Sequence, residues 1–214
     1  MIKVKKSKTK EKIKASAIKL FNENETLSIT TNHIAKDAGI SPGNLYYHYK
    51  NKEEIIREIY SNMSTNYESF NSFRNIKDSS NPLETLSFMF DKLGDLFWEY
   101  RFLIRDSALL MALDVELKKH FVSNQEKRIQ QIEGLLSFLI KEDILIPMEK
   151  EEIKLRAKVN WFISAYWQVF SSTMGEITKE SIKEGKNILF TLHILPFLTT
   201  KGKQLHSNFT VSKQ

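Results

Sequence analysis

The chain has 214 residues, of which 41% are hydrophobic and 27% are charged, and it contains 7 Gly, 4 Pro and no Cys. The lack of Cys excludes disulfides, thiolate nucleophiles and Cys-based zinc sites, and the scarcity of Gly and Pro favours a helical protein. The Lys-rich start lacks the apolar core of a signal peptide, and the most apolar stretch, residues 160–170, is too short to cross a bilayer. We therefore expect a soluble, cytoplasmic protein.

The net charge of +6 is concentrated at the N-terminus. Residues 1–60 hold 12 Lys and Arg against 7 Asp and Glu, a net charge of +5, which leaves +1 for the other 154 residues. A basic module on a nearly neutral body indicates a nucleic-acid partner at that end. A solubilising Lys-rich surface would give the same charge, so charge alone leaves both readings open.

Hydrophobic spacing near the N-terminus predicts short helices. Residues 1–7 are expected to form a frayed basic arm, and a one-face apolar stripe predicts a helix over about 9–24. A second helix is expected over about 31–38. Gly39 follows it, at a position where a positive φ can end a helix.

Capping residues mark the starts of two more helices. Ser41 and Pro42 have the character of an N-cap and a first helical residue, so we expect a third helix that ends near Tyr49. Asn51 with Glu54 three residues later resembles a capping box and starts a fourth helix.

The rest of the chain predicts a larger helical domain. A polar, turn-rich loop is expected over residues 74–82, and helices over 83–100, 101–120, 123–142, 149–174 and 178–197. No segment shows convincing alternation of apolar and polar residues, so we expect no sheet. The predicted fold class is all-α, with a three-helix helix-turn-helix domain over 1–60, a larger α-helical domain over 61–198 and a flexible tail over 199–214.

The most informative stretch is TTNHIAKDAGISPGNLYYHYKNK, residues 30–52, in which two short helices flank a Gly-Ile-Ser turn. Small residues at the start of the second helix would let its backbone approach base edges in the major groove. Asn44 offers an amide that can pair with adenine. Tyr46, His48 and Lys52 can donate hydrogen bonds to phosphates.

The pattern IA-x-x-AG-I-S-x-G-x-LYYHY-x-NKEE-I resembles that of the TetR/AcrR-like (tetracycline-repressor) family of bacterial transcriptional regulators, over about residues 9–60. The resemblance implies phosphate contacts from Thr31, Tyr46, His48 and Lys52. It implies base contacts from Asn32, Pro42, Gly43, Asn44 and Tyr47. It also implies a small core made of Ile34, Ala35, Ala38, Ile40, Leu45 and Tyr49. The chain departs from the family at residues 22–25, where Gly often stands.

These residues could also have purely structural roles. Tyr46 and Tyr47 have the spacing of core residues on a helix, and the motif reverses that preference in favour of DNA contact. Tyr49 is expected in the core. A single His such as His48 is often structural, and only its place in the motif favours a phosphate contact.

The resemblance also implies a dimer and a ligand pocket in the second domain. The helix over 149–174 is apolar nearly all round, as expected for a helix with core on one face and a partner on the other. The candidate dimer-interface residues are Phe162, Tyr166, Phe170, Ile188, Leu192 and Leu195. The candidate pocket residues are Phe88, Phe97, Trp98, Phe102, Leu110, Met111, Trp161 and Trp167. Their character indicates an apolar or aromatic effector, although each would also suit an ordinary core.

The predicted function is a ligand-responsive transcriptional repressor that binds a near-palindromic operator in double-stranded DNA as a homodimer and is released by a small molecule. We expect no enzyme activity and no cofactor, since no phosphate loop or nucleophile motif is present. The alternatives are an adaptor that acts through protein partners and a metal-dependent enzyme. The metal reading depends on Asp114, Glu116 and His120, of which the last two are four residues apart.

Overall fold

A computed structural model describes residues 2–70 and 73–211. The N-terminal part consists of α1 (Ile2–Glu23), α2 (Thr31–Asp37), α3 (Pro42–His48) and α4 (Lys52–Phe70). The larger part contains α5 (Phe73–Lys77), α6 (Pro82–Glu99), α7 (Arg101–Arg105), α8 (Ser107–Leu113), α9 (Val115–Lys141), α10 (Lys150–Ser172), α11 (Lys179–Leu189), the π-helical turn η1 (Phe190–Ile194), the 3₁₀ turn η2 (Leu195–Phe197) and α12 (Thr200–Val211). These residues form no strand, which confirms the predicted all-α fold.

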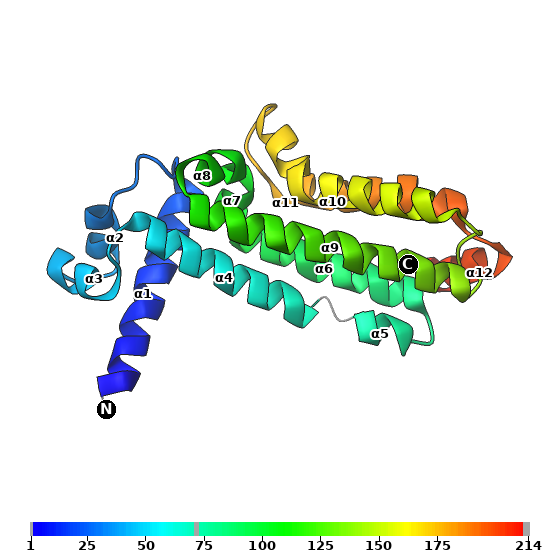
Figure 1. The fold of residues 1–214 in the computed structure, drawn as a ribbon, viewed down its shortest axis with the longest axis horizontal. Coiled ribbons are helices and arrows are strands. Elements are labelled where there is room, and N and C mark those ends of the chain that lie inside the picture. Colours follow the sequence, from blue (N-terminus) through cyan, green and yellow to red (C-terminus); the bar gives the residue numbers. More distant parts are fainter. Residues whose placement is uncertain (1, 71–72, 212–214) are drawn as a thin grey trace.

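The molecule is elongated, with α1, α2 and α3 gathered at one end (Figure 1). α4 runs from this end along the body and packs against α6, so it crosses the domain boundary predicted at residue 60. α10 packs against α9, and α11 packs against both α10 and α6. The interior of the body is therefore enclosed by helices from two layers.

The N-terminal helices share a small apolar core. Ile13, Ala17 and Phe21 recur every four residues on α1, and all three are buried. Of the six core residues that the resemblance implies, Ile34, Ala35, Leu45 and Tyr49 are buried, whereas Ala38 and Ile40 are half-buried. Burial of each large side chain stabilises the fold by about 1.5–3 kcal/mol. The packing of this core fixes α3 relative to α1 and α4.

Two helix boundaries in the body differ from the prediction. The break expected at residues 120–123 is wrong, since α9 is continuous there, and the chain instead breaks at Asp106 and Asp114. The Asp114 carboxylate accepts hydrogen bonds from the backbone N–H groups of Glu116 (3.0 Å) and Leu117 (3.1 Å). These bonds satisfy donors that the first turn of α9 leaves open, so the helix begins at this cap.

The N-terminal arm and the predicted interdomain loop are also more helical than expected. α1 already begins at Ile2, so the frayed arm predicted over 1–7 is wrong for the described residues. Within the loop predicted over 74–82, α5 extends to Lys77, and the buried Ile76 packs it against the core. Ile76 and the partly buried Phe73 thus hold this short helix against the core.

The tail predicted to be flexible from residue 199 instead forms α12, which packs against α6. The Asn81 side-chain amide donates to the Leu205 carbonyl oxygen at 3.0 Å. Gly202 lies so close to Ile144 that a Cβ would stand 2.3 Å from its carbonyl oxygen. These contacts come from segments far away in the chain, and the polar sequence of the tail gave no sign of them.

The last predicted helix ends early. α11 stops at Leu189 and continues as the π-helical and 3₁₀ turns. Pro196 has no N–H and its ring clashes with the carbonyl oxygen four residues earlier, so regular α-helical hydrogen bonding cannot continue through it. The helix predicted over 178–197 is therefore regular only in its first half.

The turn before α3 gives a test of the fold. Gly39 has φ of +65°, and a Cβ there would meet no atom within 4 Å, so only backbone strain opposes a side chain. We expect Gly39→Ala to lower the free energy of unfolding by about 1 kcal/mol, measured by urea denaturation. Gly43→Ala, inside α3 and equally unobstructed, is the control and should be neutral or stabilising. Unchanged stability of Gly39→Ala would contradict this account.

Candidate nucleic-acid interface and internal cavities

Local hydrogen bonds fix both helices of the helix-turn-helix. The Thr30 hydroxyl accepts from the backbone N–H of His33, and the His33 ring Nδ1 accepts from the backbone N–H of Thr30, both at 3.3 Å. At the start of α3 the Ser41 hydroxyl accepts from the backbone N–H of Asn44 at 3.2 Å. The caps satisfy donors at the two helix starts and set the direction of α3 against α2. They confirm the predicted N-cap at Ser41.

The residues expected to face bases lie together on the outer surface of α2 and α3. All five are exposed: Asn32, Pro42, Gly43, Asn44 and Tyr47. Of those expected to bind phosphates, Tyr46 is exposed, whereas Thr31, His48 and Lys52 are half-buried. The start of α3 therefore offers small and amide-bearing residues to a partner, and their individual contacts with DNA stay a prediction.

The three tyrosines of α3 and its C-cap have different surroundings. Tyr46 is 53% exposed and Tyr47 is 67% exposed, whereas Tyr49 is 1% exposed. Tyr46 and Tyr47 are therefore not core residues, so that interpretation is wrong. The prediction that Tyr49 lies in the core is confirmed. The hydroxyls of Tyr46 and Thr31 share a hydrogen bond of 2.9 Å, which links α3 to the start of α2 and keeps two candidate phosphate ligands side by side.

The ammonium of Lys52 binds the protein's own backbone. Its Nζ donates to the carbonyl oxygens of Thr26 (2.9 Å), Leu27 (3.3 Å) and Ile29 (2.9 Å). An ammonium has three donors, so these contacts use its full capacity. Burial lowers the pKa of Lys52 below its usual value. Lys52 therefore ties the start of α4 to the turn between α1 and α2, and its contact with a DNA phosphate stays a prediction.

A second cation binds the same turn from the body. Arg105 donates to the carbonyl oxygens of Phe21 (3.1 Å) and Asn24 (2.9 Å) and pairs with Asp106 at 2.8 Å. The Thr26 hydroxyl donates to the Asp106 carboxylate at 2.6 Å. Burial would raise the pKa of Asp106, but the hydrogen bonds from Arg105 and Thr26 hold it below its usual value. The turn that precedes α2 is thus bound to the start of α8.

Further contacts cross the same junction. The Arg57 guanidinium on α4 pairs with Asp114 at 2.6 Å, just before α9. The rings of Phe21 and Phe102 pack with centroids 4.9 Å apart. Polar and apolar contacts therefore join the N-terminal helices to the body. A displacement of α7 or α8 would consequently move the helix-turn-helix as well.

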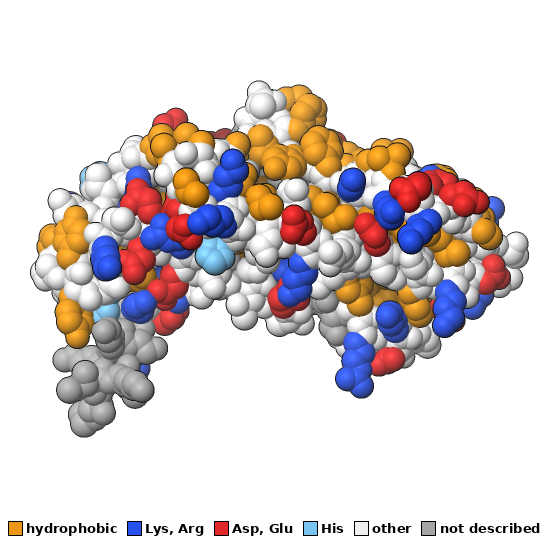
Figure 2. Space-filling model, viewed as in Figure 1, with side chains coloured by type: hydrophobic (Ala, Val, Ile, Leu, Met, Phe, Trp, Pro, Cys, Tyr) orange, Lys and Arg blue, Asp and Glu red, His pale blue; other side chains and the backbone are white. Residues whose placement is uncertain are grey.

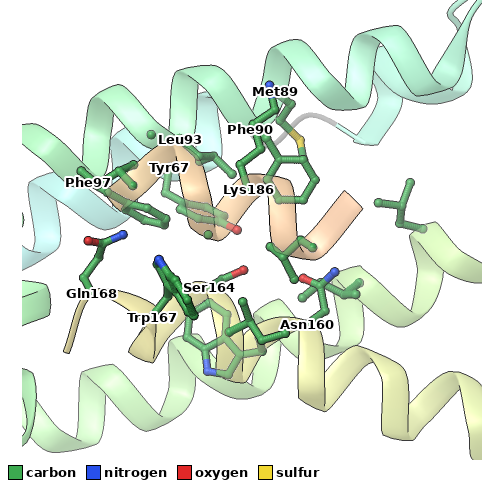
Figure 3. A pocket seen from close by; sticks show the side chains of 18 of the residues that line it. Tyr67, Met89, Phe90, Leu93, Phe97, Asn160, Ser164, Trp167, Gln168 and Lys186 are labelled. Carbon is green, nitrogen blue, oxygen red and sulfur yellow. The ribbon is translucent and has the colours of Figure 1, made fainter. Parts of the chain in front are cut away.

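Two small cavities lie inside the body. The first, of about 60 Å³, lies between α6, α9, α10 and α11, and its lining includes Met89, Leu93, Phe97, Asn160 and Trp167 (Figure 3). The second, of about 70 Å³, lies between α4, α7, α9 and α10. Tyr67, Phe97, Trp161 and Ser164 line both cavities, so these four side chains form the wall between them.

The predicted pocket residues divide into two groups. Phe97, Trp161 and Trp167 line a cavity, whereas Phe88, Trp98, Phe102, Leu110 and Met111 line neither of the two. Phe102 and Leu110 are buried in the core, and Phe88 is 52% exposed. The Arg101 guanidinium lies 4.3 Å from the Trp98 ring centroid, near the outside of the body.

The sequence prediction missed the polar residues of the cavity walls, which include Ser107, Asn124, Arg128, Asn160, Ser164 and Gln168. A polar residue in an amphipathic helix is normally assigned to the solvent face. These residues face inward because neighbouring helices cover them. The sequence signal that could have found them is a polar interruption of an otherwise apolar face, as at Asn160, Ser164 and Gln168 in α10.

Apolar side chains remain exposed on α10 and on the turn after α11. Phe162 is 62% exposed and Phe170 is 52% exposed, and Leu192 is also exposed. The other predicted interface residues, Tyr166, Ile188 and Leu195, are half-buried. Hydrophobic side chains gather along the α10 edge of the molecule (Figure 2). Such a surface on a protein of this size indicates a partner.

The geometry does not support a metal site at Asp114, Glu116 and His120. Asp114 caps α9 and pairs with Arg57, and Glu116 pairs with Lys119 at 2.8 Å. Across residues 2–70 and 73–211 no three His, Asp or Glu side chains are placed to hold a metal ion together. In the same residues no helix is both long enough and apolar enough to span a membrane.

Comparisons with known proteins point to one family. Residues 13–59 match the family described as bacterial regulatory proteins, tetR family, and residues 68–205 match the TetR family described as bacterial transcriptional repressor. The biofilm operon icaADBC negative transcriptional regulator IcaR of Staphylococcus epidermidis is 34% identical over 112 residues, which cover 52% of this chain and 60% of that protein. The match thus spans less than two thirds of that relative.

Solved structures agree in fold. A TetR-family transcriptional regulator from Marinobacter aquaeolei is 28% identical, with a TM-score of 0.82 and coverage of 94% of this chain and 97% of that one. A TetR-family regulator from Pectobacterium atrosepticum is 14% identical, with a TM-score of 0.62 and coverage of 92% and 97%. The second likeness concerns the fold alone.

The role of Lys52 gives a second test. We expect Lys52→Met to lower the free energy of unfolding by about 2 kcal/mol, because three carbonyl oxygens lose a charged donor. Urea denaturation measures the effect. Lys50→Met is the control, since Lys50 is exposed two residues earlier, and its stability should stay unchanged. Equal stability of the two variants would show that the Lys52 contacts do not support the turn.

Proposed function

This chain belongs to the TetR family of bacterial transcriptional regulators, and on that premise we propose that it is a ligand-responsive repressor. In this proposal a homodimer binds a near-palindromic operator in double-stranded DNA and a small molecule releases it. The observation that carries the proposal is the exposed surface of α3, on which Pro42, Gly43, Asn44 and Tyr47 are exposed while Leu45 packs into the core.

Base recognition is assigned to this exposed start. Pro42 and Gly43 have little side-chain bulk, so the backbone of α3 can approach the floor of the major groove. The Asn44 amide can donate to and accept from adenine in a bidentate pair. Asn32 on α2 and Tyr47 on α3 complete the set that faces bases.

Phosphate binding is assigned to Thr31, Tyr46 and His48, which flank that set. The hydrogen bond between the Thr31 and Tyr46 hydroxyls holds both groups near the start of α2. The net charge of +5 in the first 60 residues adds a sequence-independent attraction to DNA. Lys52 takes an indirect part, since it positions the turn that precedes α2.

Repression is the mode we favour. The staphylococcal relative is a negative transcriptional regulator, and it shares 34% identity over 112 residues. Blocking transcription needs only tight operator binding, for which the exposed helix-turn-helix is suited. An adaptor that acts through protein partners would not need exposed amide and hydroxyl groups at the start of α3.

The dimer is assigned to the exposed apolar edge of α10 and α11. Phe162, Tyr166 and Phe170 recur every four residues along α10, so one face of the helix carries them all. A two-fold axis at this edge would place two copies of α3 on the same side of the assembly. Recognition helices about 34–36 Å apart would read two half-sites one DNA turn apart.

The effector is assigned to the body cavities. A ligand that binds better to one arrangement of the helices shifts the population toward that arrangement. The contacts of the α1–α2 turn with Lys52, Arg105 and Asp106 give a physical connection between the body and α3.

Operator recognition is tested by selecting bound duplexes from a random pool. We expect a two-fold symmetric consensus with half-sites about one helical turn apart. Asn44→Ala should lower affinity for that consensus by about 10- to 100-fold, since a bidentate base contact contributes about 1–3 kcal/mol. Its affinity for unrelated duplex should stay unchanged. Binding that is weak and indifferent to sequence would refute operator recognition and favour the adaptor reading.

Dimerisation is tested by placing a charge on the apolar edge. Phe162→Asp should shift the protein from dimer to monomer, because each copy would bury an unpaired carboxylate in the interface. Sedimentation equilibrium measures the change. Phe88→Asp is the matched control: Phe88 is a phenylalanine on α6 with 52% exposure, against 62% for Phe162. A dimer that survives Phe162→Asp would place the interface elsewhere.

A further inference from the structure

Two residues that line the second cavity carry a buried polar group that has no hydrogen-bond partner within residues 2–70 and 73–211. They are the indole N–H of Trp161 and the hydroxyl of Ser107. Ser107 is 4% exposed, and the Trp161 nitrogen is shielded from solvent although its ring is half-buried. An unsatisfied buried donor costs free energy, and proteins normally satisfy such groups. The two groups therefore offer a donor and a hydroxyl to a molecule in the cavity.

Most of the remaining wall is apolar, and the Asn124 amide is paired. Tyr60, Met63, Phe97, Phe121, Leu103 and Ile104 supply apolar surface. The Asn124 amide donates to the Tyr60 hydroxyl at 3.0 Å and to the Ser64 hydroxyl at 2.9 Å. Its hydrogens are therefore not offered to a ligand.

The one charged residue that lines the second cavity, within the described chain, is also neutralised. The buried Arg128 guanidinium pairs with Glu68 at 2.5 Å and lies 3.9 Å from the Tyr67 ring centroid. A charged ligand would lose its hydration without gaining an unpaired counter-ion, which is unfavourable in such a site. Lys186, which lines the first cavity, is likewise paired with Asp91, so the walls of both cavities favour a neutral molecule.

The size of the cavities limits how that molecule binds. The two volumes are about 60 and 70 Å³, whereas an apolar cavity known to bind benzene has a volume of about 150 Å³. Tyr67, Phe97, Trp161 and Ser164 separate the cavities, so a shift of these side chains would join them into one chamber. A ligand of aromatic size would therefore favour an expanded arrangement of α4, α6 and α10.

We propose that the joined chamber binds a small, neutral, mainly apolar molecule with one acceptor oxygen, which accepts hydrogen bonds from the Trp161 N–H and the Ser107 hydroxyl. This inference rests on the proposed function and names the chemical class of the effector. It also assigns Ser107 as the residue through which the ligand acts on the DNA-binding end.

The route from Ser107 to DNA is short. Ser107 directly follows Asp106, whose carboxylate accepts from the Thr26 hydroxyl at 2.6 Å and pairs with Arg105. Arg105 in turn donates to the carbonyl oxygen of Asn24 at 2.9 Å. A ligand that moves the start of α8 therefore moves the turn before α2, and with it α3.

Three probes of similar size test the ligand class by calorimetry on the full chain. Acetophenone is neutral with one acceptor oxygen, isopropylbenzene lacks the acceptor, and benzoate carries a charge. We expect acetophenone to bind about tenfold more tightly than isopropylbenzene, the usual effect of one or two satisfied hydrogen bonds. Benzoate should bind more weakly than either.

Two variants assign the hydrogen bonds. Trp161→Phe keeps a ring but removes the N–H, and Ser107→Ala removes a hydroxyl that makes no bond within the described chain, so neither should unfold the protein. Each should remove most of the preference for acetophenone over isopropylbenzene. Trp98→Phe is the control, since Trp98 lines neither cavity, and it should retain the preference.

Each part of the proposal would be overturned by a different result. Equal affinity of the native protein for acetophenone and isopropylbenzene would overturn the acceptor, and tighter binding of benzoate would overturn the neutral class. Binding of none of the three, with hydration of the Trp161 N–H detected by NMR, would show that water satisfies these groups and would overturn the site. Operator selection on the same preparation separates the two hypotheses: an operator without probe binding refutes this inference alone.

The connection to DNA has its own test. Thr26→Val removes the hydrogen bond to Asp106 at nearly constant volume, and Thr26→Ser restores a hydroxyl. With Thr26→Val we expect unchanged acetophenone affinity but loss of acetophenone-induced operator release, and recovery of release with Thr26→Ser. Release that persists in Thr26→Val would overturn the assigned route.

Discussion

The turn between α1 and α2 holds the two parts of the molecule together, because cations from two other helices bind its carbonyl oxygens. Lys52, at the start of α4, binds three of them, and Arg105, at the end of α7, binds two carbonyl oxygens at the end of α1 and in the turn. Carbonyl oxygens in a turn have no helical partner, and a charged donor binds them strongly. Besides the shared apolar core, the position of α3 on the body therefore depends on two long side chains and on Asp106, which pairs with one of them.

This arrangement gives the helix-turn-helix both rigidity and a point of control. Within it, the caps at Thr30 and Ser41 and the buried Leu45 and Tyr49 fix α3 against α2 and α1. Its attachment to the body combines these polar contacts with the apolar packing of Phe21 on Phe102. Ser107, which lines the second cavity, directly follows Asp106, a residue of that attachment.

The body combines internal cavities with an exposed apolar edge. The two cavities beside Trp161 have volumes of about 60 and 70 Å³, so a ligand of aromatic size would bind there only if the surrounding helices moved apart. α10 contributes Trp161 and Ser164 to the cavity walls and Phe162 and Tyr166 to the apolar edge. A shift of α10 that admits a ligand would therefore also displace the proposed dimer interface. Ligand binding to one copy would then affect the conformation of the other.

The sequence by itself determined what depends on neighbours a few residues away: the all-α fold, the Gly39 turn, the Ser41 cap and the family motif. Tertiary structure decided the rest. It placed the Lys52 ammonium against the α1–α2 turn, formed α12 from a polar tail, and decided which aromatic residues line the two cavities. Caps and turns are made by hydrogen bonds along the chain, whereas the partner of a long side chain and the burial of a polar one depend on distant segments that only folding brings together.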